Sequence, residues 1–185
     1  MRTCRAWRQT PLPDNIKVSN FEAAVLPHID SAFNLARWLT RDDADADDVV
    51  QESYLRALKY FGGFRGGDSR AWLLKIVRNT CYSWMQKNRH YSATTEFDEE
   101  QHGAETCSPE TTLIENMDKG ILKQLLEDLP VEFREVVILR DLEGLSYKEI
   151  ADVADLPLGT VMSRLARARQ RLQSGGQAML EGVAK

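Results

Sequence analysis

The sequence predicts an all-α fold, with a three-helix bundle and a helix-turn-helix domain joined by an acidic flexible linker. Apolar residues recur at helical spacing in several segments, and no strand pattern of any length appears among the 185 residues. The periodicity stops over 91–112, where acidic and small polar residues dominate, so this segment is expected to be the linker. The domains are expected at 20–90 and 113–175, between an N-terminal tail (1–19) and a C-terminal tail (176–185).

Three helices are expected in the first domain. Apolar residues at helical spacing predict the first over about 21–39, with a start or a kink at Pro27. A polar break rich in carboxylates then precedes a second helix over about 46–60. The glycine-rich segment 62–69 is expected to be a loop, and a third helix follows over about 70–88. Short connections let three such helices close a bundle.

The second domain opens with a helix expected over about 113–126. Pro130 is expected to begin the next helix, because a first-turn residue needs no N–H donor, and Gly144 is placed to end it. In the segment Ser146-Tyr-Lys-Glu149, the serine hydroxyl can accept from the glutamate amide while the glutamate reaches back, which makes a capping box.

The capped helix is followed by a tight turn at 156–159 and a last helix over about 158–172, an arrangement typical of a helix-turn-helix. This helix has a buried apolar stripe, no acid between Thr160 and Leu172, and four arginines. Thr160 and the free amides of the helix start could take a phosphate. The residues expected to reach DNA phosphates and base edges are Thr160, Ser163, Arg164, Arg167, Arg169 and Arg171.

The net charge of −4 hides segments of opposite sign. Residues 54–90 carry eight basic side chains and one acidic one, whereas residues 20–53 carry two basic and eight acidic ones. The basic segment also contains Trp72, Tyr82 and Trp84, and a basic surface with aromatic rings suits single-stranded DNA. The tryptophans could equally be core residues.

The cysteines and histidines do not indicate a redox or metal site. Cys4, Cys81 and Cys107 are too scattered for a disulfide framework, and Cys81 falls in an apolar helical pattern that favours the core. The three histidines have no metal-ligand spacing. No catalytic residue, metal or cofactor is therefore expected. Without a membrane-spanning run or the apolar core of a signal peptide, a cytoplasmic protein is expected.

Two separate sets of motifs carry a family resemblance. The segments Ser146-Tyr-Lys-Glu-Ile-Ala and Pro157-Leu-Gly-Thr-Val-Met-Ser-Arg resemble region four of the sigma-70 superfamily. The segments Asp45-Ala-Asp-Asp-Val-Val-Gln-Glu, Phe64-Arg-Gly-Gly-Asp and Ala71-Trp-Leu-Leu-Lys-Ile-Val-Arg-Asn-Thr are similar to region two. With no extra domain between the regions, the chain resembles the extracytoplasmic-function (ECF) sigma factors.

The resemblance implies a promoter-specificity subunit of RNA polymerase that recognises −10 and −35 elements and assists promoter melting. It implies that the clamp coiled coil of the largest polymerase subunit is bound by Asp47, Asp48, Gln51, Glu52 and Leu55. It implies that the melted −10 strand is bound by Phe64, Arg65, Asp68, Lys75, Arg78 and Asn79, with a flipped base held near 64–68. The arginine-rich helix would hold the −35 element.

The family also implies control by an anti-sigma factor, which could hold the protein at the membrane, and no small-molecule substrate. One departure concerns readout, because Met162 replaces a polar or basic residue that many members use to contact bases. Two alternatives remain open. One is a transcriptional regulator that binds duplex DNA without polymerase, and the other is an enzyme or redox switch that uses Cys81, Cys107 and His102.

Overall fold

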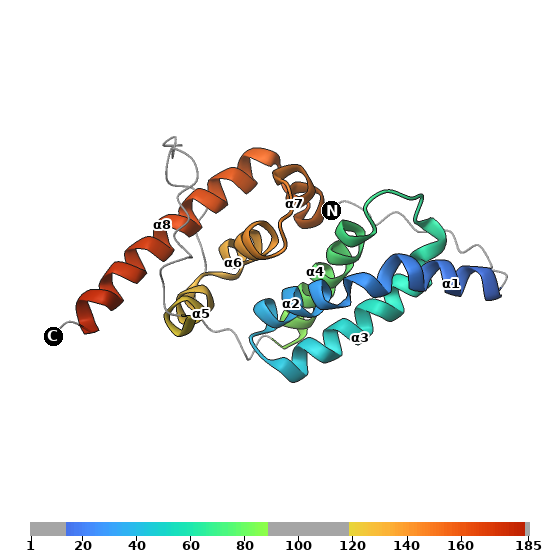
Figure 1. The fold of residues 1–185 in the computed structure, drawn as a ribbon, viewed down its shortest axis with the longest axis horizontal. Helices are drawn as coiled ribbons and strands as arrows, with labels where there is room; N and C mark the ends of the chain where they lie inside the picture. Colours follow the sequence, from blue (N-terminus) through green and yellow to red (C-terminus); the bar gives the residue numbers. More distant parts are fainter. Residues whose placement is uncertain (1–13, 89–118, 184–185) are drawn as a thin grey trace.

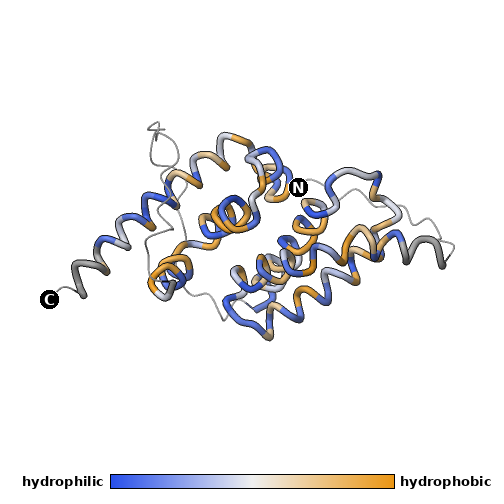
Figure 2. Tube along the Cα trace, viewed as in Figure 1, coloured by the Kyte–Doolittle hydropathy of each residue, from blue (hydrophilic) through white to orange (hydrophobic). Residues whose placement is uncertain are grey.

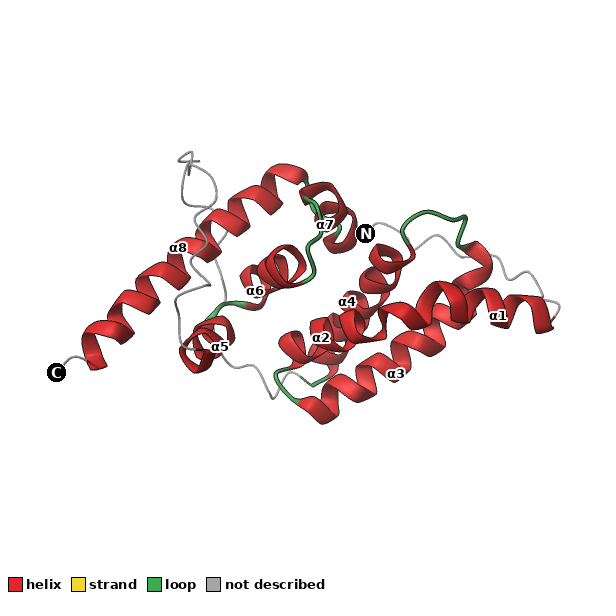
Figure 3. Ribbon diagram, in the orientation of Figure 1, coloured by secondary structure: helices red, strands yellow, loops and turns green. Residues whose placement is uncertain are grey.

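The computed structural model describes residues 14–88 and 119–183, and in this part of the chain all regular structure is helical (Figures 1 and 3). The predicted linker, Cys4, Cys107, His90 and His102 lie outside these residues. In chain order the elements are α1 (Asp14–Val25), η1 (Leu26–His28), α2 (Ile29–Thr40), α3 (Asp43–Tyr60), η2 (Phe61–Gly63), α4 (Ser69–Lys87), α5 (Lys119–Asp128), α6 (Val131–Val137), η5 (Ile138–Leu142), α7 (Tyr147–Ala154) and α8 (Leu158–Val183).

Helices α2, α3 and α4 pack together as the predicted three-helix bundle. Hydrophilic and hydrophobic segments alternate along these helices, which is the pattern of amphipathic helices that bury one face (Figure 2). The fully buried side chains include Leu35 from α2, Val49 from α3 and Leu73 from α4. Burial of a residue of this size contributes roughly 1.5–3 kcal/mol to folding. The bundle therefore depends on the apolar stripes that the sequence pattern predicts.

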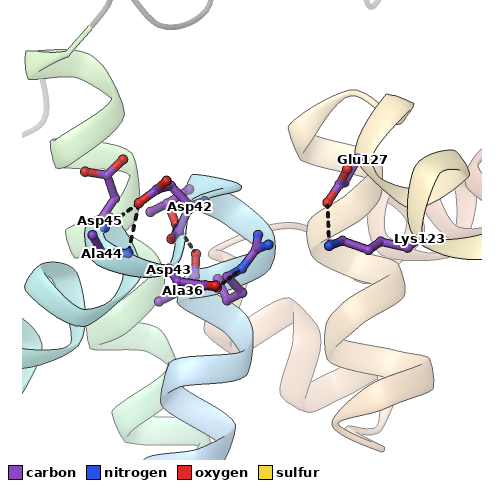
Figure 4. A network of polar contacts seen from close by, with 9 residues as sticks. Ala36, Asp42, Asp43, Ala44, Asp45, Lys123 and Glu127 are labelled. Carbon is purple, nitrogen blue, oxygen red and sulfur yellow. Dashed lines mark hydrogen bonds and ion pairs between the residues drawn. The ribbon is translucent and has the colours of Figure 1, made fainter. Parts of the chain in front are cut away.

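Aspartates cap the N-termini of two bundle helices. The Asp42 carboxylate accepts hydrogen bonds from the amides of Ala44 (2.9 Å) and Asp45 (3.0 Å) at the start of α3 (Figure 4). Asp68 does the same at α4, where it accepts from the amides of Arg70 and Ala71. Each cap satisfies amides that have no partner within the helix and is worth about 1 kcal/mol. These caps define where the two helices begin.

The break expected at Pro27 is present, because a short 3-10 turn over Leu26–His28 separates α1 from α2. The helical structure before this break begins at Asp14, which is earlier than the start predicted near Phe21. Phe21 and Val25 of α1 are buried and extend the core of the bundle. The first turns of α1, before Phe21, contain few apolar residues, so apolar periodicity did not reveal them.

The second domain contains the predicted helix-turn-helix. Ser146 and Glu149 form both hydrogen bonds of the capping box at α7, and Asp155 ends this helix in a left-handed conformation. Pro130 precedes α6 as its N-cap instead of lying in its first turn. Gly144 has a φ of +67°, so the chain can turn there after the wide turn of η5.

The last helix is longer than predicted. Its helical structure continues to Val183, so the expectation of an end near Leu172 and of a tail over 176–185 is wrong for all but the last residues. Gly175 explains how the extension packs, because a Cβ at this position would lie 2.6 Å from Cδ2 of Leu125 in α5. Gly175, although glycine weakens helix propensity, thus allows a close helix–helix contact.

The two domains also pack against each other, with α7 against α4 and α6 against α2. In Figure 1, α6 lies between α8 and the N-terminal bundle. The buried apolar residues of the described segments form one cluster that extends from Phe21 to Ala168. The structure is therefore a closed arrangement of two domains with a shared core.

A pair of glycine substitutions tests the turn at Gly144. Gly144→Ala is expected to lower the free energy of unfolding by about 1 kcal/mol, because an L side chain is strained at positive φ. Gly159→Ala is expected to raise it by about 0.4–1 kcal/mol, since a Cβ there meets open space in a regular helix. Urea denaturation of both variants measures the difference, and equal effects would contradict the role of the turn.

Candidate nucleic-acid and polymerase interfaces

One face of α3 presents all five residues predicted to bind core polymerase. Their side chains are exposed, and Leu55 is the most exposed large apolar residue of the described segments, at 69%. The opposite face of the helix is buried in the bundle. An exposed apolar residue bordered by acids is the composition of a docking surface with a basic, partly apolar partner. We call this set, Asp47, Asp48, Gln51, Glu52 and Leu55, the acidic face.

The acids near the start of α3 raise the local density of negative charge. Burial, followed by repulsion from Asp42 and Asp48, raises the pKa of Asp45 above its ordinary value. Farther along, Glu52 forms an ion pair with Arg56 one turn later on the helix. The helix dipole favours the acids of the first turn but does not account for those beyond it.

The glycine-rich loop lies over a cluster of aromatic rings. The Phe64 ring stacks on Phe61, with 5.8 Å between centroids, and lies 5.1 Å from the ring of Trp72. Arg65 and Asp68 are exposed on the loop beyond these rings. Gly66 and Gly67 have φ values of +86° and +103°, which glycine adopts without strain. The loop therefore places an open backbone next to partly buried aromatic surfaces.

The three α4 residues predicted to bind the −10 strand differ in their surroundings. Asn79 is exposed, and its side-chain oxygen accepts a hydrogen bond from Arg78 (3.3 Å). Lys75 donates from Nζ to the backbone oxygen of Asp152 in α7 (2.7 Å). Lys75 thus contacts the C-terminal domain, whereas Asn79 contacts a neighbour on its own helix.

Arg78 belongs to a buried polar network with α6. Its Nε donates to Oε1 of Glu135 (2.6 Å), and the Tyr82 hydroxyl donates to Oε2 of the same carboxylate (3.0 Å). The guanidinium also lies over the Tyr82 ring, 4.2 Å from its centroid. Burial lowers the pKa of Arg78, but the charge of Glu135 outweighs it and the net pKa is raised. Arg78 is therefore held in its charged form in this network.

A second buried carboxylate, that of Glu143, lies where α2, α4 and the end of η5 meet. It is 6% exposed, forms an ion pair with Arg70 of α4, and accepts from Nδ2 of Asn34 in α2. A separate contact between the domains is made by Arg134 of α6, which donates to the backbone oxygen of Trp38 near the end of α2 (2.8 Å). None of these contacts between domains was predicted from the sequence.

Helix α8 places its predicted apolar stripe inward, with Val161, Leu165 and Ala168 buried and Leu172 partly buried. Ser163 is exposed and donates to the backbone oxygen of Thr160. Arg164 and Arg167 are partly exposed. The start of the helix thus presents polar and basic groups on the side away from the core.

One expectation for α8 needs correction, and two of its arginines have contacts that the sequence did not predict. The Thr160 amide is not free, because it donates to the Pro157 oxygen (2.9 Å) once the helix begins at Leu158. Arg169 forms an ion pair with Asp141 (2.9 Å), and the Arg171 guanidinium lies 5.1 Å from the centroid of the Phe133 ring. Both arginines thus contact α6 or η5 of their own domain.

Cys81 is a core residue, as its apolar pattern predicts. Its side chain is fully buried, and burial, assisted by the charge of Glu135, raises the pKa of the thiol to about 12. At neutral pH almost no thiolate is present, and the thiolate is the reactive form. The structure therefore gives Cys81 no support as a redox switch.

The fold and the interfaces define a two-domain helical protein with a helix-turn-helix in its C-terminal half. Comparison with protein families identifies sigma-70 region 2 over residues 25–91 and sigma-70 region 4 over residues 119–172. The first match covers the bundle with the acidic face and α4, and the second covers α5 to the middle of α8. Both matches agree with the resemblance noted in the sequence.

The chain is 34% identical over 145 residues to the ECF RNA polymerase sigma-E factor of Salmonella typhimurium, covering 74% of this chain and 76% of that protein. It is 32% identical over 161 residues to the ECF sigma factor SigE of Mycolicibacterium smegmatis, covering 86% of this chain and 63% of that relative. A solved structure of the sigma factor RpoE of Bartonella quintana, in complex with the anti-sigma factor NepR, matches with a TM-score of 0.67 and 28% identity, over 85% of this chain and 96% of that one.

The chain therefore belongs to the sigma-70 family, in its group of ECF RNA polymerase sigma factors. Members of this family are transcription initiation factors that work with core RNA polymerase and promoter DNA. Within the described residues, no helix has the length and apolar character needed to cross a membrane.

Proposed function

We propose that this protein directs core RNA polymerase to a set of promoters by binding the polymerase with α3, the melted −10 strand with α4 and its preceding loop, and the −35 duplex with α8. The observation that carries the proposal is the presence, in one chain, of a bundle with an exposed acidic face and a capped helix-turn-helix with a basic second helix. The protein contributes recognition and strand capture, and the polymerase performs the chemistry, so no catalytic residue is assigned.

The acidic face supports polymerase binding through its composition. Its four polar residues surround Leu55 on one side of a helix whose other side is fixed in the core. A helix presents these groups on a backbone that is already ordered, so binding entails no further ordering of the backbone. The proposed partner is the clamp coiled coil of the largest subunit.

The −10 assignment rests on α4 and the loop that precedes it. Phe64, Arg65 and Asp68 lie on the loop, and Lys75, Arg78 and Asn79 lie on the helix. Aromatic rings and cations on adjacent elements can stack bases and neutralise phosphates of a single strand. Flipping a base out of the stack toward the loop has a free-energy cost of a few kcal/mol, which the contacts with the strand would offset.

The −35 assignment rests on the start of α8, where Ser163, Arg164 and Arg167 lie on the second helix of the helix-turn-helix. Met162 is exposed among them and offers no hydrogen bond, so base readout falls to the three polar residues. Thr160, Arg169 and Arg171 lie on the same helix and are assigned contacts with the phosphates of the duplex.

Arg167→Ala is expected to weaken binding of the −35 duplex by ~1–3 kcal/mol, since the substitution removes a cation that reaches a phosphate or base edge. Lys123→Ala is the matched control, because it removes one positive charge from an exposed position of α5 in the same domain. Fluorescence anisotropy of the reconstituted holoenzyme on promoter DNA measures both. Equal affinity of the two variants would refute the assignment of Arg167.

Regulation by an anti-sigma factor is part of the proposal, supported by the Bartonella relative that was solved with such a partner. The protein would act in the cytoplasm, and a membrane-bound anti-sigma factor would hold it at the membrane. The boundaries proposed for the functional parts are 20–90 for polymerase and −10 binding, 91–112 for the linker, and 113–175 for −35 binding.

In vitro transcription with added core polymerase, followed by sequencing of transcript 5′ ends, tests the whole proposal. Start sites that appear only with this protein support it. A protein that joins core polymerase without selecting start sites, or never joins it, contradicts the proposal. Specific duplex binding without polymerase would instead favour a conventional transcriptional regulator.

A further inference from the structure

Two buried carboxylates of the C-terminal domain contact basic residues of α4. Glu135 is fully buried and accepts from Arg78 and Tyr82, and Glu143 is nearly buried and pairs with Arg70. The contacts join residues 57 and 73 positions apart in the sequence, so they depend on the packing of one domain on the other. Both arginines lie on the helix that we assign to the −10 strand.

The chemistry of these contacts is that of phosphate binding. A guanidinium recognises a carboxylate and a phosphate through the same N–H donors, so one arginine cannot serve both groups fully at the same time. Lys75 is also engaged, through the backbone oxygen of Asp152. In the closed structure, the hydrogen-bond donors of α4 that could bind DNA phosphates are therefore engaged by groups of the C-terminal domain.

The end of the loop before α4 lies close to α7. The pKa of Glu149, at the start of α7, is lowered by hydrogen bonds with Ser146, and also by Asp68 and the charge of Arg70. The N-terminus of α7 thus lies next to the end of the loop where the flipped base is proposed to bind. A strand that bound Lys75 as well as the loop would compete with α7 for this lysine.

We propose that Glu135 and Glu143 form a carboxylate latch, which holds the C-terminal domain over α4 and excludes single-stranded DNA until the two domains separate. This inference rests on the proposed role of α4 in strand binding. In the latch the two carboxylates engage arginine donors that strand phosphates could otherwise use, and the free sigma factor is thereby kept from binding unwound DNA without polymerase.

The latch predicts that its removal increases DNA binding by the free protein. In Glu135→Gln/Glu143→Gln, both side chains keep their size but lose their charge, which leaves Arg70 and Arg78 without a counter-charge in the closed state. The population of the open state then rises, and apparent affinity rises with it. We expect the double variant to bind a short fluorescein-labelled deoxythymidine strand about tenfold more tightly than wild type at the same ionic strength.

Asp128→Asn is the matched control, because it removes the same kind of charge from an exposed position of the C-terminal domain. It is expected to change affinity by less than about twofold, which is the effect of net charge alone. Small-angle X-ray scattering is expected to show a larger radius of gyration for the double variant and an unchanged one for Asp128→Asn. Asn34→Ala, which removes a partner of Glu143 without altering a buried carboxylate, provides a milder variant with the same direction of change.

The latch is refuted if the double variant and Asn34→Ala match Asp128→Asn in both affinity and radius of gyration. Promoter-specific transcription by the wild-type holoenzyme would, in that case, leave the proposed function standing without the latch. Failure of the wild type to select start sites with core polymerase refutes the proposed function instead. Tighter binding combined with domain separation in the double variant supports the latch.

Discussion

Leu55→Ala is expected to weaken binding of core RNA polymerase by at least about thirtyfold, equivalent to about 2 kcal/mol, the magnitude of an interface hot spot. The side chain is 69% exposed, so its truncation removes little that holds the fold together. The variant would keep the electrostatic attraction of the acidic neighbours on the same helix face, but it would lose the apolar contact made by Leu55. Surface-immobilised core enzyme and the purified variant give the affinity directly.

Leu142→Ala provides the control for this substitution. Leu142 is an exposed leucine of the other domain, 46% accessible, so its truncation removes the same atoms outside the acidic face. It is expected to bind core polymerase as wild type does. If both leucine variants bind normally, polymerase docking must use another surface, and the assignment of α3 fails.

Asn79→Ala is expected to reduce formation of the open promoter complex by about ten- to a hundredfold while duplex binding is retained. An amide that bonds a base edge is worth ~1–3 kcal/mol of discrimination, and Asn79 is an exposed amide of α4, the helix proposed to bind the −10 strand. Permanganate footprinting of unpaired thymines measures opening, and anisotropy on the same promoter measures duplex binding.

Asn88→Ala removes the same amide from the end of α4, where Asn88 is the exposed C-cap. It is expected to melt promoters normally. Normal melting by Asn79→Ala as well would remove this residue from the −10 site, whereas equal losses in both variants would indicate a general defect of the helix.

Much of the fold follows from the sequence because its signals are local. The capping box at Ser146 and Glu149 and the glycine turn at Gly144 involve neighbours in the chain, and both are present as predicted. The apolar stripe of α8 is also a local pattern, and its inward face is confirmed.

The features that could not be predicted depend on contacts between distant segments. Gly175 and Gly176 indicate a helix end by propensity, but packing against Leu125 keeps the helix intact. Glu135 lies among apolar residues, and an acid within such a run could have signalled a buried pair. Nothing in the sequence names Arg78 as its partner, because the pairing arises only when the domains meet.

The acidic face, the −10 residues and the −35 residues are candidates from family motifs, and the substitutions above test their roles. The structure places them on α3, on α4 with its preceding loop, and on α8. It also shows that Asp68, Arg78 and Arg169 have structural partners of their own, so substitutions at these positions would combine effects on the fold and on binding.

The apolar cluster that extends without interruption through both domains has a thermodynamic consequence. Separation of the domains would hydrate nonpolar side chains, so opening should be accompanied by a positive change in heat capacity, measurable by calorimetry. That hydration opposes a spontaneous opening at ordinary temperatures. A large surface that covers the newly wetted side chains, such as that of a polymerase, would make the extended state favourable.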